Sequence, residues 1–438
     1  MPPSSATVQG GMVMSDKTLL VLSQVYVPDP ASVGQHMHDA AAATARRGHR
    51  VRVIASARGY DDPTRRYPLR EERDGVSIRR IPLGSFGKKS LAIRLLGQAS
   101  FLIQAFFRGL LTPRIGAILV STSPPMCSAV ALAISVLRRV PIVYWVMDIN
   151  PDQAVRLGLV SARSLSVRAM EWLNRQILRR AHAVVTLDRF MAETLRRKAD
   201  LDGRLAVFPP WAPANSEPVA HEDNPFRRKH GLDGKFVVMH SGNHSPSHPL
   251  DTVLRAAEQL RDRDDIVFMF IGGGCGKRGV ESAISEGASN VVNLPYQPKA
   301  ELKNSLSAAD VHLVSMGNEM VGVVHPCKIY GAMAVARPVL VLGPRECHAT
   351  ELVEFEKYGR CVEHGDVEGT VKVIGDLAAM PAVLRNLMGQ RANAVLAEHY
   401  SETRLNGLLA EILDVVIKGE KPLMEIQLET QSAARRAA

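Results

Sequence analysis

Short apolar runs of strand length alternate with helical segments along most of the chain, and this alternation constrains the fold more than any other feature. Residues 18–25 are followed by a turn-rich loop, a helix over residues 36–47 and a second apolar run at residues 51–55. Parallel strands joined by crossover helices give this order. After a Pro-rich segment at residues 209–222, the same alternation restarts at residue 236. The sequence therefore predicts an α/β protein with two doubly wound, Rossmann-like domains facing a cleft.

The other apolar runs have the length of buried strands. We expect strands at residues 115–121, 140–146, 183–186 and 205–208 in the first half, and at residues 236–240, 266–271, 291–294, 311–315 and 339–342 in the second. Residues 57–75 are charged and show no period, which predicts a loop. Residues 88–111 have apolar side chains at helical spacing, which predicts a helix that either packs in the core or lies on a membrane surface; both alternatives stay open.

Positive charge is concentrated in the first half of the chain. Residues 1–210 contain 30 Lys and Arg against 15 Asp and Glu, whereas residues 211–438 contain 24 against 29. The basic half has no recognisable nucleic-acid motif and no interleaved aromatic residues, so nucleic acid is not an expected partner. An anionic membrane surface is the expected partner, with the protein in the cytoplasm or on the inner face of the plasma membrane.

The cysteines and the ends of the chain complete the expected domain plan. The five cysteines form no CxxC pair, which argues against a zinc knuckle or a disulfide framework and fits a reducing compartment. Residues 1–16 show no signal peptide and are expected to be a disordered leader, and residues 418–438 a disordered tail. Between them we expect a first domain at residues 17–213, a second domain at residues 214–398, and a helix at residues 399–417 that packs back on the first domain.

Residues 321–343 are the stretch best suited to an anionic ligand. A polar loop with Lys328 leads into a helix of small residues at about 329–335, and an apolar strand follows. Helix N-termini attract anions because their first amides are unpaired, so Ile329 and Tyr330 are candidate phosphate contacts. Lys328 would neutralise a diphosphate, or it is a solvated loop lysine.

Polar residues after two first-half strands are candidates for the acceptor side. Asp148 ends an apolar strand and would orient or deprotonate an acceptor hydroxyl; alternatively, it caps the helix that follows Pro151. Gly34 and Gln35 follow the first strand and are candidate acceptor contacts, since ligands of such sheets bind beyond the carboxyl ends of the strands.

Glycines after two second-half strands are candidate phosphate contacts. Gly242 with Asn243, and Gly272, Gly273 and Gly274, would let the backbone approach a phosphate, or they form plain turns.

Three histidines in and around the first of these glycine loops are spaced four residues apart. His240, His244 and His248 would share one face of a helix, but Gly242 and Pro246 prevent a helix there. We therefore expect no metal site.

Five motifs, in this order along the chain, resemble those of family 4 glycosyltransferases, which have the GT-B fold. YVPDPASVGQHMHDAAAATARRGHRVRVIA and WVMDINPDQAVRLGLV are similar to the acceptor domain of that family. HSGNHSPSHPLDTVLRAAEQL, FMFIGGGCGKRGVE and NVVNLPYQPKAELKNSLSAADVHLV resemble its Gly-Asn loop, Gly-rich turn and base-binding turn. The likeness spans about residues 18–417. The loop with Pro326, Lys328, Tyr330 and Arg337 is most similar to bacterial exopolysaccharide enzymes of the colanic-acid type.

The resemblance implies a retaining, metal-independent hexosyltransferase without a cofactor. It would move a sugar from a nucleotide diphosphate sugar to a glycan or polyprenyl-linked acceptor in exopolysaccharide or cell-envelope synthesis. It adds Gln297, in the base-binding turn, to the candidate donor contacts. It also adds His248, which lies where the wider family has a cation. The glutamate pair of the wider family is absent, because Val323 and Gly331 occupy those positions.

Two alternatives to a transferase stay open. One is a nucleotide-sugar epimerase or hydrolase on the same fold, which would convert the donor without an acceptor. The other is a non-catalytic binding subunit, which the missing glutamates favour.

Overall fold

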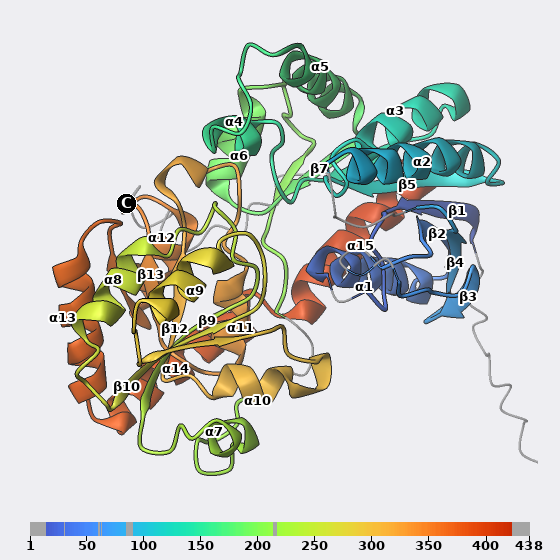
Figure 1. Cartoon of the computed structure of the whole chain (residues 1–438). Helices are drawn as coiled ribbons and strands as arrows, with labels where there is room; N and C mark the ends of the chain where they lie inside the picture. The colour runs from blue at the N-terminus through green and yellow to red at the C-terminus, as the bar shows by residue number, and fades with distance from the viewer. Residues whose placement is uncertain are drawn as a thin grey trace, which may run out of the picture. The chain divides into compact units, whose positions relative to one another are not determined.

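Two parallel-stranded sheets confirm the predicted Rossmann-like architecture (Figure 1). The computed structural model describes residues 15–29, 31–59, 62, 64–84, 91–212 and 217–422. Within them the chain forms two compact units of discontinuous segments: residues 15–145, 176–184 and 406–422 in the first, and residues 146–175 and 185–405 in the second. The expected domain boundary at residues 213–214 stays a prediction.

The first sheet has the strand order β3-β4-β2-β1-β5-β6-β7-β8. Its strands are β1 (Ser15–Leu22), β2 (His49–Ser56), β3 (Arg70–Arg73), β4 (Val76–Ile81), β5 (Ile115–Ser121), β6 (Ile142–Trp145), β7 (Ala183–Thr186) and β8 (Leu205–Val207). Residues 19–22 of β1 are fully buried. Such a strand lies in the middle of a sheet covered on both faces, which explains its uninterrupted apolar sequence.

The prediction of a loop at residues 57–75 is partly wrong. β3 pairs antiparallel with β4 through a turn at Asp74 and Gly75, both of which have positive φ, and β4 continues the sheet parallel to β2. β3 has the sequence REER and lies at the sheet edge, where charged side chains can stay in solvent. An edge strand of this kind has no apolar pattern to reveal it.

The helices beside the first sheet include α1 (Ser32–Arg46), α2 (Leu91–Leu110), α3 (Cys127–Arg138) and α15 (Glu402–Lys418) (Figure 1). α2 packs against α3. α15 is held at β2, because the His49 Nε2 lies 2.6 Å from the Asp414 carboxylate. Lys88 and Lys89, at the start of the helix that the sequence predicts, lie outside the described residues. No helix of the described chain has both the length and the apolar character needed to cross a membrane.

The second sheet is parallel throughout, in the order β11-β10-β9-β12-β13-β14. Its strands are β9 (Phe236–Ser241), β10 (Ile266–Ile271), β11 (Val291–Leu294), β12 (Val311–Ser315), β13 (Val339–Leu342) and β14 (Gly359–Val362). The other helices are α4 (Asp152–Arg156), α5 (Leu165–Arg180), α6 (Arg189–Arg196), α7 (Pro225–Lys229), α8 (Asp251–Gln259), α9 (Lys277–Ser285), α10 (Leu302–Ser307), α11 (Lys328–Ala334), α12 (His348–Glu356), α13 (Val367–Ala379) and α14 (Ala382–His399), with 3-10 turns at Lys299–Glu301 and Asn318–Met320.

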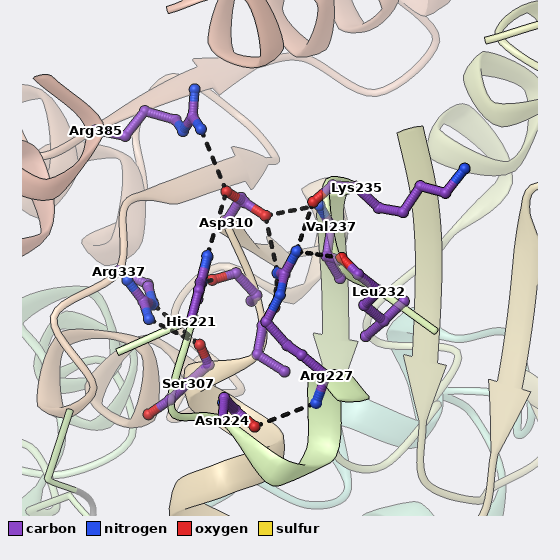
Figure 2. Close-up of polar contacts among 12 residues, drawn as sticks. His221, Asn224, Arg227, Leu232, Lys235, Val237, Ser307, Asp310, Arg337 and Arg385 are labelled. Atoms are coloured by element: carbon purple, nitrogen blue, oxygen red, sulfur yellow. Dashed lines mark hydrogen bonds and ion pairs between the residues drawn. The ribbon is translucent and has the colours of Figure 1, made fainter. Parts of the chain in front are cut away.

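A buried carboxylate binds two arginines at the amino ends of β9 and β12 (Figure 2). The Asp310 oxygens lie 3.2 Å from Arg227 and 3.4 Å from Arg385, and they accept the Val237 amide at 3.0 Å. Arg227 also donates to three backbone carbonyls. Because the ligands of parallel sheets bind at the opposite, carboxyl ends of the strands, we assign this network to stability.

Candidate active site

The carboxyl ends of β9 and β10 place two glycine-containing loops side by side. The Gly242 amide donates to the Ile271 carbonyl at 2.8 Å. Gly242, Gly272 and Gly274 have φ angles of 130°, 139° and 119°. A Cβ on Gly272 would lie 1.9 Å from the Gly242 carbonyl oxygen, and one on Gly274 would lie 2.4 Å from the Asn243 Oδ1. Contact between the two loops therefore requires Gly272 and Gly274 even without a ligand.

The turn after β11 contacts the same pair of loops. A Cβ on Gly273 would lie 3.1 Å from the ring of Tyr296. The neighbouring Gln297 is half-buried and donates to the Pro295 carbonyl at 2.9 Å. Gln297 therefore lies next to the predicted donor loops, and its contact with a nucleotide stays a prediction.

The candidate acceptor contacts Gly34 and Gln35 lie in the first unit, in the first turn of α1. A Cβ on Gly34 would come 3.0 Å from the Tyr26 Cα, so this glycine lets the helix approach the loop after β1. A contact with an acceptor stays a prediction for both residues.

The side chain of Lys328, the first residue of α11, lies against Gly242. A Cβ on Gly242 would come within 2.7 Å of the Lys328 Cε, so a side chain at position 242 would displace the lysine. Lys328 is half-buried, and desolvation lowers the pKa of its ammonium to about 8. Within the described part of the chain, no carboxylate forms an ion pair with it. An anionic ligand would supply the missing counter-charge.

The start of α11 is less suited to an anion than the sequence predicts. The helix has only seven residues. The Ile329 and Tyr330 amides donate to the Pro326 and Cys327 carbonyls at 3.2 and 3.3 Å. A phosphate could bind these two amides only by replacing the turn bonds. The Lys328 ammonium is therefore the main group that this loop offers to an anion.

His240, in β9, and His244 and His248, in the loop after it, are neutral near pH 7. Each directs its Nδ1 at a backbone carbonyl, at 3.3 Å for His240 and His244 and at 2.7 Å for His248. Burial, together with the nearby Lys328 charge, lowers the pKa of all three, to about 3 for His248. His248 therefore cannot supply the positive charge that the resemblance implied. Among the described residues, no group of His, Cys, Asp or Glu side chains is arranged to hold a metal ion.

Asp148 follows β6 and lies against the loop that leads to Lys328, where it forms an antiparallel bridge with Val324. The N-cap of α4 is Pro151, so the alternative role of Asp148 as the cap of this helix is wrong. Burial raises the pKa of the half-buried Asp148 carboxyl to about 6, although the nearby His325 opposes the rise. The carboxyl therefore changes its charge near neutral pH, as a general base must.

Four buried polar side chains lie beside the loop that leads to Lys328: Asp188, His325, Tyr330 and His348. The sequence predicts a role for Tyr330 but not for the other three. His325 Nδ1 lies 2.7 Å from the Asp188 carboxylate, and its Nε2 lies 3.0 Å from the Tyr330 hydroxyl. The same hydroxyl lies 2.9 Å from the His348 Nε2. No member is more than 9% exposed. The side chain of Tyr330, a predicted donor contact, thus points into the interior, and its contact with a donor stays a prediction.

Two doubly wound sheets, with the glycine-containing loops at the carboxyl ends of strands in the second, give the chain the GT-B fold. The glycosyl transferase 4-like domain family matches residues 32–211, and the glycosyl transferases group 1 family matches residues 222–395. The chain therefore belongs to the family 4 type of glycosyltransferases.

The chain is similar to one curated relative over most of its length. It is 26% identical over 382 residues to the putative colanic acid biosynthesis glycosyl transferase WcaI of Escherichia coli K12, covering 83% of this chain and 92% of the relative.

Two solved structures show the same fold. Sucrose-phosphate synthase from Thermosynechococcus elongatus superposes with a TM-score of 0.72 at 15% identity, covering 92% of this chain and all of the other. HepE from Anabaena, in complex with UDP-glucose, gives 0.67 at 17% identity, covering 91% and 99%.

Proposed function

We propose that the protein transfers a hexose from a nucleotide diphosphate sugar to an acceptor hydroxyl, with retention of configuration at the transferred sugar. The observation that carries the proposal is the Lys328 ammonium, a half-buried cation without a carboxylate partner among the described residues, which lies across Gly242. The UDP-glucose bound to HepE, a protein of the same fold, supports a nucleotide-sugar donor.

The chemistry requires charge stabilisation at the leaving diphosphate. When the bond between the sugar C1 and the diphosphate oxygen breaks, negative charge grows on the terminal phosphate. Lys328 would stabilise this charge without a metal ion. Asp148 would orient the acceptor hydroxyl and take its proton. Both residues adjoin the loop at residues 321–328, and Asp148 does so through its bridge to Val324.

A transfer assay tests the proposal and separates it from the two alternatives. Purified protein is incubated with radiolabelled UDP-, GDP- and dTDP-sugars, with and without a bacterial lipid extract. Label in a lipid or glycan product supports the transferase, and the anomeric coupling in its proton NMR spectrum reports retention. Conversion of the donor without an acceptor would instead support an epimerase or hydrolase, and nucleotide binding without turnover a binding subunit.

We further propose a lipid-linked acceptor in cell-envelope or exopolysaccharide synthesis, reached at an anionic membrane by α2. One face of α2 is packed in the core, where Phe101 and Ala105 are fully buried. The opposite face carries Leu96, Ile103 and Phe107, which are seven and four residues apart and 64%, 59% and 58% exposed. Both predicted roles of this helix are thus compatible with one structure: a core face and an apolar outer stripe.

Exposed arginines lie at the ends of α2 and α3. Arg138 donates to the Leu110 and Thr112 carbonyls at the end of α2, and the neighbouring Arg139 is exposed, as are the apolar Val136 and Leu137 of α3. Exposed apolar side chains on helices that also carry arginines suit the interface of an anionic lipid membrane.

Flotation with vesicles tests the membrane proposal. We expect binding to vesicles with anionic lipid at low salt, weaker binding to neutral vesicles, and a drop of about tenfold in the bound fraction for Phe107→Glu, because an apolar anchor is replaced by a charge that the surface repels. The control is Leu384→Glu, at a 48% exposed leucine of α14. Equal losses for both variants, or no binding to anionic vesicles, would contradict the proposal.

The two shifted pKa values predict a bell-shaped pH profile. Asp148 acts as the carboxylate, so kcat/KM for the donor is expected to fall as pH drops through about 6. Lys328 acts as the ammonium, so kcat/KM is expected to fall as pH rises through about 8. The alkaline limb should disappear in Lys328→Arg, since a guanidinium stays protonated. A profile that is flat between about pH 5 and 9 would refute both assignments.

A further inference from the structure

The four buried side chains beside the Lys328 loop form one run of hydrogen bonds. Burial alone would raise the pKa of Asp188, but its interactions with His325, His348 and the Met191 amide together outweigh the burial and lower the pKa, which favours the ionised carboxylate. The carboxylate accepts from the His325 Nδ1, and the tautomer of His325 with its proton on Nδ1 accepts at Nε2 from the Tyr330 hydroxyl. In that arrangement the Tyr330 oxygen accepts from the His348 Nε2. Each bond fixes the orientation of the next group.

This chain of bonds ties three helices together. Asp188 is the N-cap of α6 and accepts the Met191 amide at 2.8 Å. Tyr330 lies in the first turn of α11, and His348 is the first residue of α12. An ion pair also joins α6 to α12, between Arg189 and Glu351.

The bonds also hold the chain on both sides of Lys328. His325 lies three residues before the lysine, and its carbonyl accepts the Cys327 amide at 2.9 Å. Tyr330 lies two residues after it, and its ring stacks on that of His325 with an interplanar angle of 9°. The backbone that carries the lysine is therefore anchored in the interior at both ends, while the lysine itself lies across Gly242.

We propose that Asp188, His325 and Tyr330 are positioning residues, which fix the Lys328 ammonium where it binds the terminal phosphate of a nucleoside diphosphate. An ionised carboxylate is costly to bury, and apolar residues could fill the same space with less loss of solvation. What such a network adds is a single geometry for the groups bonded to it. The inference rests on the proposed function, because it assigns the diphosphate as the ligand of that site.

Nucleotide binding gives a test that needs no turnover. Titration calorimetry with UDP and UMP, and with GDP and GMP, compares ligands that differ only by the terminal phosphate. Tyr330→Phe is expected to weaken diphosphate binding about tenfold and to leave monophosphate binding within twofold, because the misplaced ammonium meets only the terminal phosphate. Asp188→Asn should act in the same way, since asparagine still caps α6.

Two further variants distinguish positioning from general damage to the fold. In the Lys328→Met background, Tyr330→Phe should cause less than a twofold further loss, because the group that it positions is gone. Tyr358→Phe is the matched control: Tyr358 is also fully buried, but among the described residues its hydroxyl donates to the Met333 sulfur alone, at 3.6 Å. It should leave both affinities unchanged.

The outcomes separate this inference from the proposed function. Equal losses for diphosphate and monophosphate, or losses that add fully to that of Lys328→Met, would overturn the positioning role alone. No binding of any nucleoside diphosphate to the wild-type protein would overturn the proposed function together with the inference.

Discussion

Replacing Lys328 with methionine is expected to lower the turnover of sugar transfer about 10²- to 10³-fold, the usual loss when one group that stabilises a developing oxyanion is removed. Methionine keeps the apolar stem of the side chain but removes the charge. Because desolvation already disfavours this ammonium, the folded protein should be as stable without it as with it. Steady-state kinetics and a thermal unfolding curve of the same preparation measure the two effects.

Two companion variants isolate the role of the charge. Lys372→Met removes a lysine from the exposed side of α13 and should change neither turnover nor donor affinity. Lys328→Arg restores a cation of different shape and should recover part of the turnover. Unchanged turnover and donor affinity in Lys328→Met would remove this lysine from the mechanism.

The strands that the sequence predicts best are parallel, and all but one of them are buried. The expected runs at residues 115–121, 183–186, 266–271, 311–315 and 339–342 coincide with β5, β7, β10, β12 and β13, and the run at residues 291–294 coincides with β11, an edge strand in which only Val291 is buried. A parallel strand inside the sheet is covered on both faces, so most of its residues are apolar.

The elements that the sequence missed lack such a contrast. β3 is an edge strand of four charged residues, and nothing in REER distinguishes it from a loop. α12 was missed for the opposite reason, because all of its first six residues, from His348 to Val353, are buried. Because this part of α12 is buried on every side, its sequence has no polar face and therefore no helical periodicity.

The candidate site was predictable only in part. Lys328 and Asp148 stand out because each is a charged residue that adjoins an apolar run, where burial is costly. The network of Asp188, His325, Tyr330 and His348 could not be predicted, because its members come from three separate segments. Alone, Asp188 has the sequence signature of a helix cap, a role that it also fills.

The glycines show a different limit of sequence reasoning. Gly242, Gly272 and Gly274 are predicted from the need for a ligand to approach the backbone, whereas the structure requires Gly272 and Gly274 because the two loops touch each other, and Gly242 because the Lys328 side chain lies against it. The residue type was a correct signal of close approach, but it does not say which partner approaches.

Replacing Asp310 with alanine is expected to destabilise the second unit by about 3–5 kcal/mol, the range found when one partner of a buried ion pair is removed. Asp310 is 6% exposed, and its loss leaves the 3% exposed Arg227 without a counter-ion (Figure 2). The Val237 amide at the start of β9 loses its acceptor as well. A fall in Tm of roughly 10 °C corresponds to this loss.

Asp233→Ala is the matched control, since Asp233 is an exposed aspartate just before β9 and should change stability by less than about 0.5 kcal/mol. Hydrogen exchange can locate the damage: protection should fall first in β9 and β12, which Asp310 joins through Val237 and its own position before Val311. β1 and β5, in the first sheet, should keep their protection. Equal stability of the two variants would show that Arg227 is satisfied by its three backbone carbonyls alone, and that the carboxylate contributes little beyond them.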